Sequence, residues 1–262
     1  MQTKRRFWTS AQVATLVAER YGVVYSKRQI QRLLRRLGMY CYKPQPRDYR
    51  QPPDAEDKLY ERLRAVADVL RQWGQDLDKV CVGFADESST QLQANRQRVW
   101  SFESGLTRSV NSDKKKVNSF GFYAIRGNSV LSQLPQGNEE HLLKMLPLIR
   151  QANPEAQTIL LLWDNHTAHL TRAMQEHAQR LGIILINLPT YSPNLNPIER
   201  IWKHIKKAVS EQGFVKDVGH LERIVRQCFQ QASQKLSFAK GWIDKFWNQL
   251  FPDSPIPLSA KL

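Results

Sequence analysis

Cysteine is scarce in this sequence of 262 residues. The three cysteines, Cys41, Cys81 and Cys228, lie far apart and form no CxxC pair. An odd number of isolated cysteines supports neither a disulfide framework nor a cysteine zinc site. A reducing compartment is therefore the simpler expectation.

Long apolar runs are also lacking. No stretch approaches the roughly 20 apolar residues that a membrane-spanning helix needs. The first residues, MQTKRRFWTSAQ, are basic but have no apolar segment of the kind found in secretory signals. The sequence therefore predicts no membrane span, and we expect a cytoplasmic protein.

Acidic residues are rare in the first fifty positions. The formal net charge of the chain is +15, and residues 1–50 hold twelve Lys or Arg against the two acids Glu19 and Asp48. The remainder is nearly balanced. A basic module in front of a larger domain suits a polyanionic partner such as DNA, because each neutralised phosphate releases counterions. A solvated basic face is the alternative explanation.

Two short helices are predicted in this basic module. Thr9 or Ser10 caps a helix over 11–20, and Ser26 caps a second helix over 27–37 that Gly38 ends. The second helix carries an apolar stripe of Ile30, Leu33, Leu34 and Leu37 at helical spacing, which predicts a buried face. Such a pair reads as a helix-turn-helix, and a generic helical hairpin is the alternative. The candidate DNA-contacting residues are Lys27, Arg28, Gln31, Arg32, Arg35 and Arg36.

The rest of the chain predicts a mixed α/β domain. Strands are expected over 79–86, 98–102, 117–125 and 130–134, the last after a Gly127-Asn128 turn. Helices and two strands then alternate: a helix from Asn138 or Glu139 to 152, a strand over 158–163, a helix to Leu181, a strand over 183–188 and a helix over 196–210. The predicted organisation is a helix-turn-helix or winged-helix-like domain over 1–42, a linker over 43–54, a connecting helix over 55–78, a catalytic domain over 79–251 and a tail over 252–262.

Three acidic residues stand at informative positions of this plan. Asp86 closes the first predicted strand and Asp164 follows the apolar strand TILLLW. Glu199 stands at the start of a helix, and 34 residues separate it from Asp164. Each has a local alternative: a turn for Asp86, an Asx turn for Asp164, and for Glu199 a capping box with Asn196 or a pair with Lys203. Glu87 would point to the opposite face of its strand and is a worse candidate. None of these local roles explains why three carboxylates occur where two strands and a helix start converge.

Carboxylates in this arrangement favour metal-dependent phosphoryl transfer. Mg²⁺ takes oxygen ligands, with few of them from protein. Two ions roughly 4 Å apart hold the attacking and leaving oxygens of an in-line displacement at phosphorus. We therefore expect Asp86, Asp164 and Glu199 to be metal ligands for two Mg²⁺ ions, with Mn²⁺ as a substitute.

The segments FADES, DNHTAH and YSPNLNPIERIW resemble the catalytic motifs of DDE transposases of the mariner superfamily, in its bacterial insertion-sequence branch. The resemblance covers nearly the whole chain. It implies a ribonuclease H-like α/β fold with a mixed sheet flanked by helices, after a small all-α helix-turn-helix domain. It also implies cut-and-paste transposition, in which Asp86, Asp164 and Glu199 act at inverted-repeat ends, with a TA target.

The same resemblance implies partners and supporting residues. The partners are double-stranded DNA at the transposon ends and target, and further copies of the chain in a dimeric or larger synaptic complex near the bacterial nucleoid. His169 orients the site or a phosphate by its place in the motif, and a hydrogen bond at a helix start is the alternative. His166 and His169 lack the partners of a zinc site. The other supporting candidates are Asn165, Asn196 and Pro197, the last two in a proline-stiffened loop that delivers Glu199.

One departure and two rival functions stay open at this point. Relatives of this kind usually carry two helix-turn-helix units, and this chain shows one, so we expect weak end recognition unless a separately encoded partner supplies the other. The rivals are a catalytically inactive DNA-binding protein that kept the fold, and a ribonuclease H-like structure-selective nuclease. The intact triad argues against the first and the helix-turn-helix against the second.

Overall fold

The computed structural model of the chain describes residues 8–41, 48–93, 109–134, 139–165, 169, 171–212 and 214–258. The chain divides into two compact units, Met1–Arg47 and Asp48–Leu262, and each is described by itself. The strand predicted over 98–102, the residue His166 and the predicted helix start at Asn138 lie outside the described residues.

The first unit contains helices α1 (Ser10–Tyr21) and α2 (Lys27–Arg36). Each begins with a capping box, in which Thr9 or Ser26 accepts a backbone hydrogen bond and a glutamine three residues later reaches back. Gly22 ends α1 with a left-handed φ of 67°, a conformation that glycine adopts without steric cost. The two predicted helices are therefore confirmed.

The predicted buried stripe of α2 is only partly correct. Ile30 is fully buried, but Leu33 and Leu37 are 38% and 69% exposed. Two helices of twelve and ten residues cover only one narrow strip of each other, so most of the stripe stays at the surface. The basic residues of α2 are all exposed, and the neutral Gln31 is half-buried.

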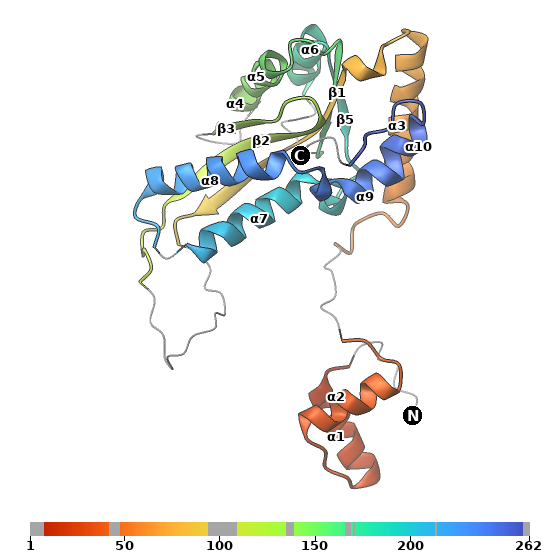
Figure 1. Cartoon of the computed structure of the whole chain (residues 1–262), viewed down its shortest axis with the longest axis vertical. Coiled ribbons are helices and arrows are strands. Elements are labelled where there is room, and N and C mark those ends of the chain that lie inside the picture. The colour runs from red at the N-terminus through yellow and green to blue at the C-terminus, as the bar shows by residue number, and fades with distance from the viewer. Residues whose placement is uncertain are drawn as a thin grey trace. The chain divides into compact units, whose positions relative to one another are not determined.

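The second unit is built on a five-stranded sheet with the order β3-β2-β1-β4-β5 (Figure 1). β1 (Val80–Gln91), β2 (Lys116–Arg126) and β3 (Val130–Gln133) are antiparallel, whereas β4 (Thr158–Trp163) and β5 (Ile183–Asn187) continue the sheet in parallel from β1. β4 is buried at every position, as its continuous apolar sequence predicts. The expected mixed sheet is confirmed.

The prediction that Asp86 closes its strand is wrong, because β1 runs on to Gln91. The polar segment from Asp86 to Gln91 stays in the sheet because it forms a long antiparallel ladder with β2. The parallel pairing with β4, however, ends at Phe84 and Leu162. Asp86 therefore lies just beyond the point where β4 ends, in the middle of its own strand.

Helices cover both faces of the sheet (Figure 1). The helices are α3 (Ala55–Gln72), α4 (Glu139–Leu143), α5 (Met145–Ala152), α6 (Arg172–Arg180), α7 (Ile198–Glu211), α8 (Val218–Ser233), α9 (Lys240–Trp242) and α10 (Asn248–Leu250). Short helical turns are η1 (Leu77–Lys79), η3 (Pro193–Leu195), η4 (Leu236–Phe238) and η5 (Ile243–Trp247).

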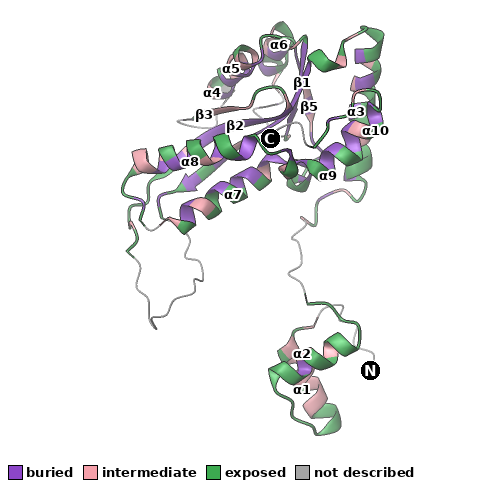
Figure 2. Ribbon diagram, viewed as in Figure 1, coloured by how far each residue is buried: buried purple, intermediate pink, exposed green. Residues whose placement is uncertain are grey.

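The sheet and its helices enclose two hydrophobic cores. One core contains Val82, Phe84 and Leu160 of the sheet with the inner sides of α3, α7 and α8 and the C-terminal helices. The other contains Ala85, Phe122 and the helices α4 to α6. Figure 2 shows buried residues along the inner sides of α7 and α8 and exposed ones outside.

Two predicted helices differ from the structure for local reasons. The helix expected to end at 152 is split into α4 and α5, because Pro147 has no N–H to donate to Leu143 and fits only in the first turn of a new helix. The helix expected directly after Asp164 begins only at Arg172, where the side chain of Thr171 caps it by accepting from Met174 N at 3.2 Å. Among the described residues, no helix is long and apolar enough to cross a membrane.

Gly121 allows α7 to lie close to the sheet. It is the antiparallel partner of Asp86, and a Cβ atom at this position would lie 2.7 Å from the Trp202 ring of α7. We expect Gly121→Ala to push α7 outward and to lower the free energy of unfolding by about 1–3 kcal/mol, as overpacking does. Urea denaturation measures this, with Gly241→Ala as the control because its added Cβ has no neighbour within 4 Å. An unchanged stability for Gly121→Ala would contradict the close approach.

Candidate active site

The three predicted carboxylates line one cleft of about 340 Å³. Asp86 comes from β1, Asp164 follows β4, and Glu199 lies in the first turn of α7. The cleft is lined by Asp86, Asp164, Asn165, Leu188, Pro189, Thr190, Tyr191, Ser192, Pro193, Asn196 and Glu199. The structure thus brings together three side chains that span 113 positions of the sequence, from Asp86 to Glu199.

Asp86 is the carboxylate in the least favourable surroundings for a negative charge. Its pKa is raised well above the ordinary value, first by burial and then by the charges of Glu199, Glu87 and Asp164. Burial disfavours the charged form, and like charges disfavour it further. A cation in the cleft would relieve both effects.

Glu199 is delivered by a loop that Asn196 attaches to the sheet. The buried side chain of Asn196 donates from Nδ2 to the carbonyl oxygen of Ala85 at 3.1 Å, directly before Asp86. α7 then begins at Ile198 behind the buried Pro197, and its start has no side-chain cap. The capping-box interpretation of Glu199 is therefore wrong, since Asn196 is committed to β1 instead. No ion pair joins Glu199 to Lys203, both of which are described residues.

Asn165 connects the ends of β4 and β5. Its Nδ2 donates to the carbonyl oxygen of Leu188, and Leu188 N donates to Trp163 O at 2.7 Å. These bonds fix the backbone on both sides of Asp164. Asn165, Asn196 and Pro197 all lie at the site or directly beside it, and their supporting role stays a prediction.

His169 lies behind the cleft between two carboxylates. Its Nδ1 is 2.7 Å from Asp164 Oδ1 and its Nε2 is 3.3 Å from Glu87 Oε1. The imidazole is 1% exposed and stacks on the Trp163 ring, with centroids 3.8 Å apart. Its neighbours are carboxylates and an indole, which is the environment of a positioning group and not of a zinc site.

The same contacts set the charge of His169. Burial alone would lower the pKa of the imidazole, but the hydrogen bonds and charges of Asp164 and Glu87 raise it to about 9. A raised folded-state pKa stabilises the protein fully below the unfolded value of about 6.5, and this stability is lost as the pH rises through about 9.

We therefore expect the stability difference between the metal-free protein and His169→Gln to shrink between pH 6.5 and 9. The change should be roughly 2 kcal/mol, less than the full pKa shift implies because Asp164 is half-exposed and screened by solvent. Urea denaturation at several pH values measures it, with the half-buried His177 of α6 replaced by glutamine as a control. A pH-independent difference would show that His169 carries no such charge.

The loop that precedes Glu199 contains a strained residue, Tyr191, and is contacted by residues 48–51. Among the described residues, Tyr191 is the non-glycine residue that has a left-handed φ, of 54°. It is 47% exposed and lines the cleft. Arg50 stacks on its ring at 3.9 Å and is itself held by Asp48 at 2.9 Å. Gln51 Nε2 donates to Asn194 Oδ1 at 2.9 Å. Residues 48–51 thus brace the loop that precedes Glu199.

The cleft offers the donors that a divalent cation requires. Its polar side chains present oxygen atoms, and Asn196 Oδ1 is buried with no hydrogen-bond partner among the described residues. An orphaned acceptor beside three carboxylates suits a hard cation or its water ligands. Within the described ranges, no three His, Cys, Asp or Glu side chains lie close enough together to hold a metal ion by themselves. The donor set fits a divalent cation whose coordination is completed by water or DNA.

Sequence reasoning missed two groups near the site. Glu87 contacts His169 and Arg50 contacts Tyr191, and in each case the partner lies far along the chain. The alternation of β1 placed Glu87 correctly on the face opposite Asp86, which is why it does not line the cleft. No local signal indicated the histidine on that face. The candidate DNA-contacting residues of α2 belong to the first unit and are not part of this cleft.

Comparison with known proteins identifies both units. A family profile described as "DDE superfamily endonuclease" matches residues 82–222, more than half of the chain, and a profile described as "Winged helix-turn helix" matches residues 4–58. A transposase of the element Tcb2 from Caenorhabditis briggsae is 37% identical over 46 residues, which are 18% of this chain and 17% of that protein. The match therefore spans less than a fifth of that relative.

Solved structures match over most of the chain. The mariner Mos1 paired-end complex with Mg has a TM-score of 0.62 at 15% identity, covering 97% of this chain and 81% of that chain. The corresponding complex with Mn has a TM-score of 0.56 at 17% identity, covering 90% and 75%. At these identities the similarity shows the fold alone, which is the ribonuclease H-like arrangement predicted from the sequence.

Proposed function

Because this chain belongs to the DDE superfamily of endonucleases, we propose that it is a DNA transposase that cleaves transposon ends and joins them to target DNA. The observation that carries the proposal is the convergence of Asp86, Asp164 and Glu199 on one cleft. The matched Mos1 structures are paired-end complexes, and the relative from Caenorhabditis briggsae is a transposase. Cut-and-paste transfer with a TA target is the finer proposal.

The carboxylates would hold two divalent cations, Mg²⁺ or Mn²⁺, that stabilise the charge developing on the oxygens exchanged at phosphorus. Asp86 supplies a half-buried oxygen donor from the middle of β1, where its backbone is held by the sheet. Asp164 supplies a donor whose Oδ1 is held by His169. Glu199 supplies a third donor from the start of α7, where the helix backbone and Asn196 set its position. Glu199 is the member of the set that moves if α7 moves.

The chain's remaining contribution to the reaction is to exclude misplaced substrate. Pro189, Pro193 and the braced Tyr191 line the same cleft as the carboxylates. Prolines and a stacked tyrosine limit the positions open to the DNA backbone, so the scissile phosphate meets the carboxylates in few orientations. No covalent intermediate with the protein is required, because positioning and charge stabilisation carry this class of reaction.

DNA binding by the first unit completes the proposal. Lys27, Arg28, Arg32, Arg35 and Arg36 are exposed on α2, and a second helix of a helix-turn-helix enters the major groove. Two chains on paired ends would form the synaptic complex, and a separately encoded helix-turn-helix partner is an alternative source of end specificity. These assembly states belong to the proposal.

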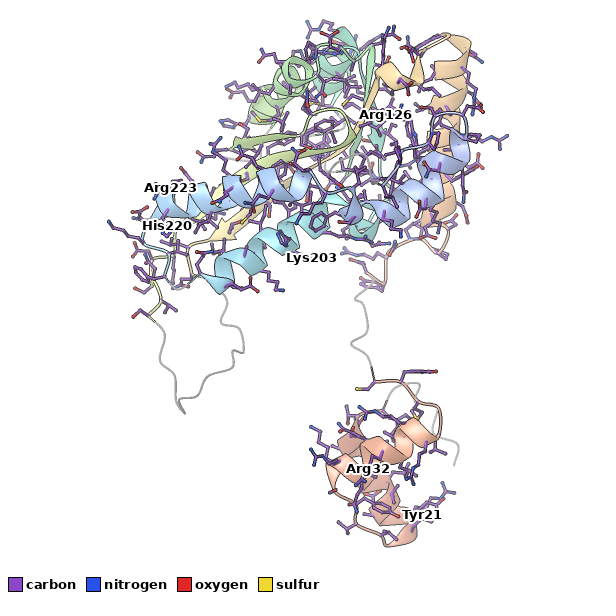
Figure 3. All side chains as sticks on the ribbon, in the orientation of Figure 1. Tyr21, Arg32, Arg126, Lys203, His220 and Arg223 are labelled. Atoms are coloured by element: carbon purple, nitrogen blue, oxygen red, sulfur yellow. The ribbon has the colours of Figure 1, made fainter. Side chains whose placement is uncertain are left out.

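We expect Arg32→Ala, at a position labelled in Figure 3, to weaken binding to an inverted-repeat duplex. If Arg32 contacts a phosphate, affinity falls on all sequences and the slope of log affinity against log salt drops by about 1. If it contacts a base, the loss is about 1–3 kcal/mol and confined to the specific site. Fluorescence anisotropy at several salt concentrations measures both, with Arg64→Ala of α3 as the control. Unchanged binding to every duplex would remove Arg32 from the interface.

A strand-transfer assay tests the proposed activity as a whole. The full chain is incubated with Mg²⁺, a plasmid that contains TA sites and, in separate reactions, a pre-cleaved or an intact transposon end. Joined products support the transposase. Cleavage of intact ends without joining would indicate a nuclease instead, and binding without either reaction would indicate an inactive DNA-binding protein.

A further inference from the structure

Asp86 and Glu87 are neighbours on β1 that face opposite sides of the sheet. Asp86 lines the cleft, whereas Glu87 does not and reaches His169 instead. Their partners on β2 are Gly121 and Phe120, so the alternation of an undistorted ladder separates them. Asp86 therefore lies on the face of the sheet that carries the cleft, and Glu87 lies on the opposite face, beside His169.

We infer that Glu87 is a positioning residue which, through the imidazole of His169, holds the carboxylate of Asp164 in the orientation that binds a divalent cation. The inference rests on the proposed function, because it assigns a role in building the same metal site. It adds a residue that the carboxylate triad does not include.

The imidazole of His169 is fixed on three sides. Trp163 stacks on its plane with an interplanar angle of 25°, and the two ring nitrogens lie 2.7 Å from Asp164 Oδ1 and 3.3 Å from Glu87 Oε1. A ring held only by stacking could rotate in its own plane and carry Nδ1 away from Asp164. Glu87 opposes this rotation because its Oε1 lies 3.3 Å from Nε2 at the opposite edge of the ring, where the two groups form an ion pair and not an aligned hydrogen bond.

Asp164 needs such support more than its companions. Its side chain is 54% exposed and follows the last residue of β4, so neither burial nor sheet pairing fixes its rotamer. Asp86, in contrast, is packed within β1. Partners behind a metal ligand orient it, and their loss typically lowers metal affinity about 10–100-fold.

A direct metal-binding role for Glu87 does not agree with the geometry. Its carboxylate contacts the buried edge of His169, and the alternation of β1 directs it away from the cleft that Asp86 lines. A purely structural ion pair would stabilise the fold without affecting the cation. The experiment must therefore separate metal affinity from stability.

Mn²⁺ binding to the full chain, followed by electron paramagnetic resonance, provides this separation. We expect Glu87→Ala to weaken Mn²⁺ binding about 10–100-fold. Glu87→Gln retains an oxygen acceptor at the same reach and should bind within about threefold of the unsubstituted protein. Failure of the glutamine to rescue binding would show that Glu87 acts as a ligand or by charge alone, and would overturn the positioning role.

A double-mutant cycle tests the route through His169. In a His169→Gln background, Glu87→Ala should have no further effect on Mn²⁺ affinity, because the group that transmits its influence is gone. Additive losses would overturn the inference. The control is Glu140→Ala, which removes an exposed carboxylate of α4 that pairs at 2.8 Å with Lys144, between α4 and α5.

Thermal melting without metal accompanies each measurement, so that a Glu87→Ala variant that fails to fold is recognised and replaced by Glu87→Leu, which fills more of the same space without an oxygen acceptor. The two proposals fail in different ways. Absence of Mn²⁺ binding by the unsubstituted chain would reject the proposed metal site itself. Equal binding by the unsubstituted chain and a folded Glu87→Ala variant would reject only the role of Glu87.

Discussion

Asp164→Asn is expected to lower strand-transfer activity by roughly 10³-fold or more, which corresponds to about 4 kcal/mol of transition-state stabilisation. The substitution exchanges a charged oxygen donor for a neutral amide without changing the size of the side chain. The amide oxygen still accepts from His169 Nδ1, so the local structure behind the cleft is kept. DNA binding by the first unit should change little, because the substituted residue belongs to the other unit.

The measurement is single-turnover joining of a pre-cleaved end in Mg²⁺, with duplex binding measured on the same preparation. Asp68→Asn is the matched control, because Asp68 is an exposed aspartate of α3 that pairs with Arg71 at 3.0 Å. Activity of Asp164→Asn within about tenfold of the unsubstituted protein would sink the proposed site. A parallel loss of DNA binding would instead point to misfolding.

Trp202→Ala is expected to lower the free energy of unfolding by about 3–5 kcal/mol, the usual cost of removing a large buried aromatic side chain. Trp202 is 1% exposed on the inner side of α7. Its ring lies 5.7 Å from that of Phe229 on α8 and against Gly121 of β2. Its loss would leave a cavity among α7, α8 and the sheet, at the junction that sets the position of Glu199.

Urea denaturation provides the value, and Trp73→Ala provides the matched control because Trp73 is 60% exposed. The control should cost less than about 1 kcal/mol, as surface substitutions usually do. Similar losses for both tryptophans would mean that α7 is not held through Trp202. Because Glu199 moves with α7, the Trp202 variant should also bind Mn²⁺ more weakly than the control.

Some elements were predictable because one force dominates them. The run TILLLW is apolar from Ile159 onward and forms β4 with the predicted bounds, since both of its faces are buried. The two helices of the first unit could be predicted from Thr9 and Ser26, because each capping side chain bonds to a backbone N–H only three residues further along the chain. The mixed sheet and the three candidate carboxylates could likewise be located from local patterns.

Other features depended on residues far apart in the sequence. The segment DESSTQ has no strong strand signal, and it stays in β1 only because β2 pairs with it. Asn196 fits a helix cap by local rules, yet its side chain is taken by Ala85, 111 positions earlier. The contact between Glu87 and His169 required the loop after β4 to return behind β1. Local propensity gives way in each case to a tertiary partner.

The place of β1 in the sheet also has a consequence for biosynthesis. β1 can form its antiparallel hairpin with β2 early, but its parallel partner β4 and the helix that carries Glu199 emerge from the ribosome much later. Pairings between distant segments form slowly, and chains fold progressively as they are made. Under the proposed function, a product whose translation stops before Glu199 would keep the DNA-binding first unit while lacking a complete set of carboxylates. Such a product would occupy DNA without cutting it.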